Sequence, residues 1–295
     1  MGRFWSLLFL MVPIVGVGTF VAGPLIGHWL PADVSAHGRQ IDHLFSFCLW
    51  LTGAVFVATE VALFWFLWKY DAHKNPEAPK FTHGSHYLEL VWTLLPAATL
   101  LFIAIYQINA WADVKIKKPD VRPYNKKGEL IAWAAPSTVE VKARQFEWRL
   151  RYPYTPEYIY ETGADGRQVK KLDAAGKPEV ERDANGRVVY AYGPDDVFAV
   201  NDMHIPVDEE ILLDLKSEDV LHSFFLPNLR VKQDAVPGSE IPVWFRAKKT
   251  GTFDLVCAEL CGWGHYKMKG RLTIESRADY DAWLARLKAE QEAVK

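Results

Sequence analysis

The sequence lacks an excess of charge of either sign, because 34 Lys and Arg residues face 36 Asp and Glu residues and leave a formal net charge of −2. A nucleic-acid-binding protein usually carries a basic excess, so this balance argues against that class. The sequence also contains no CxxCH segment, which excludes a c-type haem attached to this chain. With 50% of its 295 residues hydrophobic, the chain has too few polar residues for a disordered protein. A folded protein with a sizeable buried hydrophobic part is therefore expected.

Long apolar runs are confined to the first 112 residues, while the remainder has an ordinary soluble composition. The runs are residues 4–27, 44–68 and 90–112. Each meets the length of about 20 apolar residues that a helix needs to cross hydrocarbon. The first run precedes Val34-Ser35-Ala36, small residues that also suit a signal-peptidase site. Residues 1–36 are therefore either a retained span or a cleaved signal peptide, and residues 37–112 form a hairpin of two spans.

The distribution of lysine gives the orientation. Lys69, Lys74 and Lys80 follow the second run, whereas Arg39 is the one Lys or Arg residue between the first two runs. Cytoplasmic loops are the lysine-rich ones, so the loop after the second run is cytoplasmic. The sequence predicts a multi-pass protein of the plasma (inner) membrane, with everything after residue 112 on the outer, periplasmic side. Glu89, at the start of the third run, then lies at the cytoplasmic face.

Short alternating segments dominate the second half. Residues 138–152 alternate apolar and polar with a slip near Gln145, which predicts a strand with a bulge. Similar runs occur at residues 188–192, 210–216, 241–247, 251–256 and 270–275. The pattern predicts an all-β sandwich or barrel over residues 113–276. The polar stretch near 162–187 is expected to be a surface insertion, and residues 277–295 to be a terminal amphipathic helix.

A cluster of metal-binding residue types lies near the C-terminus of the β region. Cys257, Cys261, His265 and Met268 follow the pattern C-x3-C-x3-H-x2-M, and His222 lies 35 residues before Cys257. Thiolate, imidazole and thioether form a soft ligand set suited to copper. Two thiolates can bridge a pair of copper ions, each also bound by one histidine. A disulfide and a zinc site are the alternatives, but neither needs the thioether.

From about residue 40 to residue 275 the sequence resembles subunit II of cytochrome c oxidase. The resemblance implies a membrane α-helical hairpin followed by a cupredoxin-like domain that carries two copper ions, the dinuclear copper A centre. The implied function is to accept electrons from a cytochrome c type donor and pass them to haem in subunit I, which reduces O2 to water. The alternatives are the copper A subunit of a nitric oxide or nitrous oxide reductase, and a copper-free structural subunit of a quinol oxidase.

The resemblance also assigns roles to residues. The side chain of Glu259 would bind magnesium at the interface with subunit I, and Glu89 matches the acid at the mouth of a proton channel. The implied copper ligands are His222, Cys257, Cys261, His265, Met268 and the backbone carbonyl of Glu259.

One departure from the family concerns the electron donor. The family pattern Gln-Trp-x-Trp contains a tryptophan linked with electron uptake, and here the stretch is Gln145-Phe146-Glu147-Trp148. Phe146 and Trp148 are the expected residues for electron uptake. The change to Phe146 predicts a donor other than the usual soluble cytochrome c, either a membrane-tethered cytochrome or a supercomplex partner. The extra N-terminal span and the insertion are available to contact other oxidase subunits.

Overall fold

The computed structural model divides the chain into two compact units. It describes residues 2–71, 81, 83–116, 138–153, 160–162, 168–174, 176, 178–179 and 196–294. The helical unit comprises Met1–Pro31 and Gln40–Asp113, and the β unit comprises Ala32–Arg39 and Val114–Lys295.

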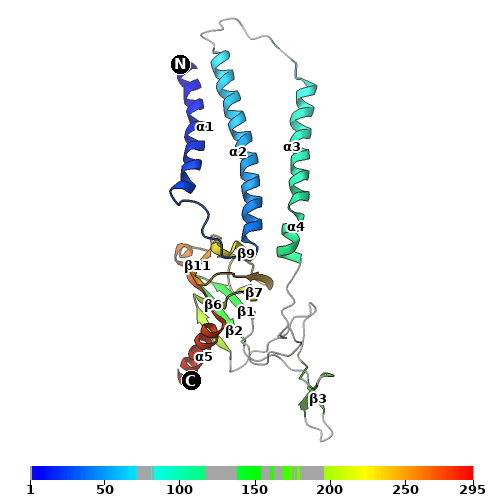
Figure 1. Cartoon of the computed structure of the whole chain (residues 1–295), viewed down its shortest axis with the longest axis vertical. Coiled ribbons are helices and arrows are strands. Elements are labelled where there is room, and N and C mark those ends of the chain that lie inside the picture. Colours follow the sequence, from blue (N-terminus) through cyan, green and yellow to red (C-terminus); the bar gives the residue numbers. More distant parts are fainter. Residues whose placement is uncertain are drawn as a thin grey trace. The chain divides into compact units, whose positions relative to one another are not determined.

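Three helices make up the helical unit, and each is long and apolar enough to cross a membrane (Figure 1). They are α1 (Gly2–Leu25), α2 (Gly38–Lys69) and α3 (His86–Tyr106), followed by the short α4 (Ile108–Trp111) and the π-helical turn η1 (Ala112–Ile116). Phe47 of α2 packs against Phe102 and Tyr106 of α3, with ring centroids 6.1 and 5.3 Å apart. The α2 helix begins six residues before the predicted apolar run. The run misses these residues because the first turn of the helix is polar.

Two five-stranded sheets form the β unit, which confirms the cupredoxin-like sandwich. The first sheet has the order β10-β7-β1-β2-β5 and the second β6-β12-β11-β8-β9. The first contains β1 (Thr138–Arg144), β2 (Glu147–Tyr152), β5 (Val197–Val200), β7 (Glu210–Ser217) and β10 (Ile241–Arg246). The second contains β6 (Asp202–Pro206), β8 (His222–Leu226), β9 (Val231–Ala235), β11 (Gly251–Cys257) and β12 (Lys269–Glu275).

The prediction of one bulged strand over residues 138–152 is wrong. Strands β1 and β2 form an antiparallel hairpin in which Ala143 pairs with Trp148 and Arg144 with Glu147. A two-residue turn and a bulge both shift the alternation, so periodicity alone does not distinguish them. The two residues in the turn are Gln145 and Phe146. The strands β5, β6, β8 and β9 were also not predicted, and the predicted strand at 188–192 lies outside the described residues.

The segment between the first two helices belongs to the β unit. The Val34 N–H donates to the carbonyl of Asn228 at 3.0 Å, and the Val34 carbonyl accepts from the Lys248 N–H at 2.7 Å. Ser35 forms a β-bridge with Ala247, just beyond β10. The Val34 side chain is only 3% exposed and is part of the hydrophobic core. This short segment therefore completes the sandwich.

The sequence predicts a terminal helix, and α5 (Arg277–Val294) is that helix and packs on the sandwich. Tyr280, Trp283 and Leu284 are buried, and His204 of β6 stacks on Trp283 with ring centroids 4.0 Å apart. At the start of the insertion, β3 (Tyr160–Thr162) and β4 (Gln168–Lys170) form a small antiparallel hairpin. The second half of the insertion, from residue 180, lies outside the described residues.

Candidate metal centre

The two ends of neighbouring strands bring the predicted ligands together. His222 is the first residue of β8 and Cys257 the last residue of β11. Because these strands are antiparallel, with Cys257 opposite Phe224, both residues lie at the same end of the second sheet. The loop after β11 carries Cys261 and returns at Met268, whose carbonyl accepts the Cys257 N–H at 3.1 Å. The predicted copper ligands thus converge.

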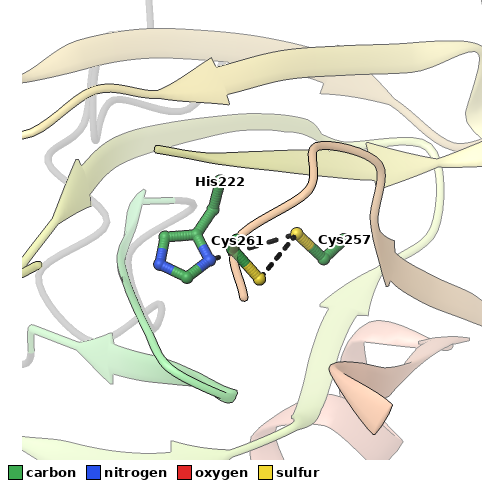
Figure 2. A group of neighbouring side chains, drawn as sticks. All are labelled: His222, Cys257 and Cys261. Carbon is green, nitrogen blue, oxygen red and sulfur yellow. Dashed lines mark hydrogen bonds between the residues drawn. The ribbon is translucent and has the colours of Figure 1, made fainter. Parts of the chain in front are cut away.

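The sulfur and nitrogen atoms face one another across short distances. The Sγ atoms of Cys257 and Cys261 are 3.9 Å apart, and both cysteines are free. Each has its own histidine: Cys257 Sγ lies 4.0 Å from Nδ1 of His222, and Cys261 Sγ lies 3.7 Å from Nδ1 of His265. Figure 2 shows the His222 ring turned toward the two sulfur atoms. A disulfide would need a separation of about 2.05 Å, so the structure does not contain that alternative.

A thioether and a carbonyl complete the donor set. The Sδ atom of Met268 lies 3.9 Å from Cys261 Sγ, and the Glu259 carbonyl lies 3.2 Å from Cys257 Sγ. Both cysteines, His222 and Met268 are buried. A structural zinc site uses four donors and leaves a thioether without a role. The donors present are two soft sulfurs that can bridge, two imidazoles and a thioether, which fits a pair of copper ions better.

The two thiols differ in acidity. Burial raises the pKa of Cys257, but hydrogen bonding to His222 and at the backbone of Ser223 outweighs it and gives a pKa of about 6. Burial and the negative charge of Cys257 together raise the pKa of Cys261 to about 11. A negative charge on Cys257 thus favours the protonated form of Cys261. A metal bound by both sulfurs must displace the second proton.

Asp219 orients the buried histidine, a role that the sequence analysis missed. Its Oδ1 lies 2.8 Å from Nε2 of His222. Burial opposes ionisation of Asp219, but hydrogen bonds from His222, Gln145 and Val220 lower its pKa. The anionic carboxylate accepts the Nε2–H of His222 and keeps Nδ1 turned toward Cys257, where Nδ1 can bind a metal once it gives up its own proton. A carboxylate behind a metal-binding histidine fixes its tautomer and ring orientation. The available signal was an aspartate three residues before the histidine.

Gln145 joins the two sides of the site, and it was also missed. Its backbone N–H donates to Oδ2 of Asp219 at 2.8 Å, and its side-chain amide donates to the carbonyl of Cys261. One residue of the β1–β2 turn thereby fixes both the loop before β8 and the loop after β11. The donor set is thus held from both sides.

Replacing Asp219 with asparagine should weaken copper binding. An amide keeps the shape but removes the charge that sets the His222 tautomer, and loss of such partners costs about 10–100-fold in metal affinity. The affinity is measured by competition with a copper chelator. The matched control is Asp254→Asn on the exposed face of β11. Equal affinity in both variants would show that Asp219 does not position the ligand.

The two aromatic residues expected in electron uptake occupy different environments. Trp148 is fully buried, with its ring centroid 6.3 Å from that of His222. It therefore cannot touch a docking protein. Phe146 is half-buried in the β1–β2 turn, and the ring of Trp263 lies over it at a centroid distance of 5.2 Å. Their role in electron uptake stays a prediction.

Glu89 lies in the helical unit, in the first turn of α3. Ser85 caps this helix by accepting the Leu88 N–H at 3.5 Å. The Glu89 side chain is 48% exposed, and its Oε2 lies 3.2 Å from Nδ1 of His86. An acid in the first turn of a helix is stabilised by the helix dipole. The carboxylate is thus accessible at the end of α3.

Two family models match the chain. The model described as the transmembrane domain of cytochrome c oxidase subunit II matches residues 25–109, and the model of its periplasmic domain matches residues 193–275. Together they cover more than half of the chain. Both descriptions agree with the predicted location, a membrane protein with an outer soluble domain.

Curated relatives and a solved structure are similar to this chain. The alternative cytochrome c oxidase subunit 2 of Bradyrhizobium diazoefficiens is 28% identical, over 95% of this chain and 91% of that protein. The cytochrome c oxidase subunit 2 of Cereibacter sphaeroides is 29% identical, over 85% of this chain and 77% of that protein. The crystal structure of the periplasmic domain of subunit II of cytochrome oxidase of Bradyrhizobium japonicum is 26% identical, over 52% of this chain and 94% of that chain, with a TM-score of 0.36.

Proposed function

Because the chain belongs to the cytochrome c oxidase subunit II family, we propose that it is the electron-accepting subunit of a proton-pumping haem-copper oxidase. It receives electrons from a cytochrome c type donor at a dinuclear copper centre. The electrons pass to haem in subunit I, where O2 is reduced to water. The partners are therefore subunit I, the other oxidase subunits and the donor, which is membrane-tethered or part of a supercomplex.

The observation that carries this proposal is the pair of unbonded, buried thiols, each with its own histidine Nδ1. When bound, a copper pair supplies a one-electron site whose charge is shared over two ions, which lowers the reorganisation on reduction. His222, Cys257, Cys261, His265 and Met268 would hold it, with the carbonyl of Glu259. The protein holds these donors rigidly and excludes water from the sulfurs.

The donor kinetics test this function. In the purified oxidase, a reduced c-type cytochrome mixed in a stopped-flow instrument should reduce the copper chromophore before the haem of subunit I. Steady-state turnover should consume O2. Haem reduction that precedes copper reduction would contradict the proposed order. Turnover of nitric oxide without oxygen uptake would assign the chain to a different terminal reductase.

Glu259 is proposed to bind magnesium at the interface with subunit I through its side chain. Its backbone carbonyl faces Cys257 Sγ at 3.2 Å, on the copper side. A change of the side chain therefore leaves this carbonyl in place. Glu259→Ala should keep the copper signal and weaken the interface metal, measured by metal analysis and by manganese substitution. Glu259→Gln separates the loss of charge from the loss of volume. Loss of copper with magnesium unchanged would contradict this assignment.

Glu89 is proposed to collect protons at the cytoplasmic face. Its exposed carboxylate in the first turn of α3 is able to exchange protons with water. Glu89→Ala should slow proton uptake and turnover by about tenfold or more, since loss of a positioned proton-transfer group has effects of that order or larger. The copper spectrum should not change. The control is Tyr87→Phe in the same exposed turn; equal turnover in both variants would count against the proton role.

A further inference from the structure

The loop that carries Cys261 and His265 also carries large exposed aromatic side chains. Trp263 is 79% exposed and Tyr266 is 67% exposed. The ammonium of Lys267 lies over both rings, 5.6 Å and 5.5 Å from their centroids. We call these three residues the loop patch. An exposed tryptophan on a soluble domain is typical of a contact surface, where it often contributes much of the binding energy.

The loop patch is held in one position. The His265 N–H donates to the Gly262 carbonyl at 3.1 Å, and the Lys267 N–H donates to the Gly264 carbonyl at 2.9 Å. The side chain of Gln145 holds the carbonyl of Cys261. A site whose supporting backbone is fixed in this way is preorganised for binding. Trp263 is therefore a fixed anchor rather than a side chain on a loose loop.

Gln145 and Phe146 pack against the loop backbone at the two glycines beside Trp263. A Cβ atom on Gly264 would lie 2.5 Å from Cδ2 of Phe146. One on Gly262, where φ is +133°, would lie 2.7 Å from Nε2 of Gln145 and 3.3 Å from Cε1 of Phe146. Trp263 then covers the Phe146 ring edge-on, at 69°. The outermost aromatic ring over this side of the ligand loop is thus Trp263, which is two residues from Cys261 and two from His265. Phe146 lies behind it.

The charges beside the turn largely neutralise one another. Glu147 lies 2.8 Å from Arg149 and 3.7 Å from Arg144, and Arg149 also lies 3.7 Å from Glu218. Exposed paired charges of this kind give little net field for steering a charged partner. Lys267 adds a positive charge within the loop patch itself. At this point an uncharged or acidic partner surface fits Lys267 better than one that presents a lysine there.

We propose that Trp263 is the side chain that contacts the electron donor, and that the loop patch docks a haem protein whose exposed haem edge is rimmed by uncharged or acidic side chains. The inference rests on the proposed function. One electron would leave the ferrous haem of the donor, which becomes ferric, and would be accepted by copper held by His222, Cys257, Cys261, His265 and Met268. No bond forms or breaks and no proton moves. Trp263 positions the haem edge beside the ligand loop, with Phe146 and Trp148 behind it.

The test uses the purified oxidase with Trp263→Ala and Trp263→Phe, and with Phe198→Ala as an exposed aromatic control on β5. The probes are two soluble c-type cytochromes, one acidic and one basic. For the acidic probe, Trp263→Ala should lower the bimolecular rate of electron transfer by roughly tenfold or more. The dissociation constant between this variant and the oxidised acidic probe, measured by calorimetry, should rise by about the same factor. Trp263→Phe should give a smaller loss, and Phe198→Ala none.

A second variant tests the charge of the loop patch. Lys267→Glu should slow the acidic probe and speed the basic one, with the copper spectrum unchanged. A rate or dissociation constant within about twofold of the wild type in Trp263→Ala would overturn the proposal. Loss of the chain from the purified complex would place Trp263 at a subunit interface and would also overturn it. A failure of the proposed function can be told apart from a failure of this docking proposal. In the first case the wild type itself would lack the dinuclear copper signal.

Discussion

Replacing Cys257 or Cys261 with serine is expected to abolish the dinuclear copper signal in the purified oxidase. Each sulfur faces the other sulfur at 3.9 Å and a histidine Nδ1 at 3.7 to 4.0 Å, so the proposed pair of copper ions would need both sulfurs as ligands. A serine hydroxyl stays protonated at neutral pH and is a hard ligand, which makes it a poor bridge for copper. Because serine has nearly the size of cysteine, the sandwich should still fold.

The third cysteine offers a matched control. Cys48 lies in α2, in the helical unit, and Cys48→Ser should leave the copper spectrum unchanged. Electron transfer from the donor should stop in the two site variants and continue in the control. A dinuclear spectrum that survives Cys257→Ser or Cys261→Ser would remove that cysteine from the ligand set.

Replacing Val34 with aspartate is expected to destabilise the β unit. The Val34 side chain is 3% exposed within the core, and both of its backbone groups are hydrogen-bonded to the sandwich. An unpaired charge buried there should lower the free energy of unfolding by about 3 kcal/mol or more. Thermal loss of the copper absorbance in the purified oxidase measures the effect. The control is Ala32→Asp, at an exposed position of the same segment.

The same contacts bear on the N-terminal segment. Cleavage after Ala36 would remove Val34 and leave a cavity in the sandwich, so we propose that residues 1–36 are retained, with α1 as a span before the hairpin at 37–112. Sequencing of the mature chain should place its N-terminus before Ala32. A mature chain that starts at His37, or equal stability of the two aspartate variants, would contradict this view.

The parts of the fold that depend on local pattern were predictable from the sequence. Apolar runs of sufficient length marked the three helices, and helical spacing marked residues 277–294, which became α5. The predicted ligands Cys257, Cys261, His265 and Met268 lie within twelve residues, so their spacing already indicated one loop. The helix ends were less predictable, because α2 and α3 begin in polar residues before their apolar runs, whereas α1 ends at Leu25 and α3 at Tyr106, inside theirs.

The parts that depend on distant contacts were not predictable. The roles of Asp219 and Gln145 depend on the β1–β2 turn lying beside the loops before β8 and after β11. The sequence alone does not show that these segments are neighbours. The turn at Gln145 and Phe146 produces the same one-residue slip as a bulge. Val34 lies in a short segment between two helices, and only its contacts with Asn228 and Lys248 reveal it as part of the sandwich.

The most direct test is electron paramagnetic resonance of the oxidised, purified oxidase enriched in a single copper isotope. If two thiolates bridge two copper ions, the unpaired electron should show hyperfine coupling to two equivalent copper nuclei, and metal analysis should find two copper ions bound to this chain. A hyperfine pattern from one copper nucleus, or zinc in place of copper, would contradict the account.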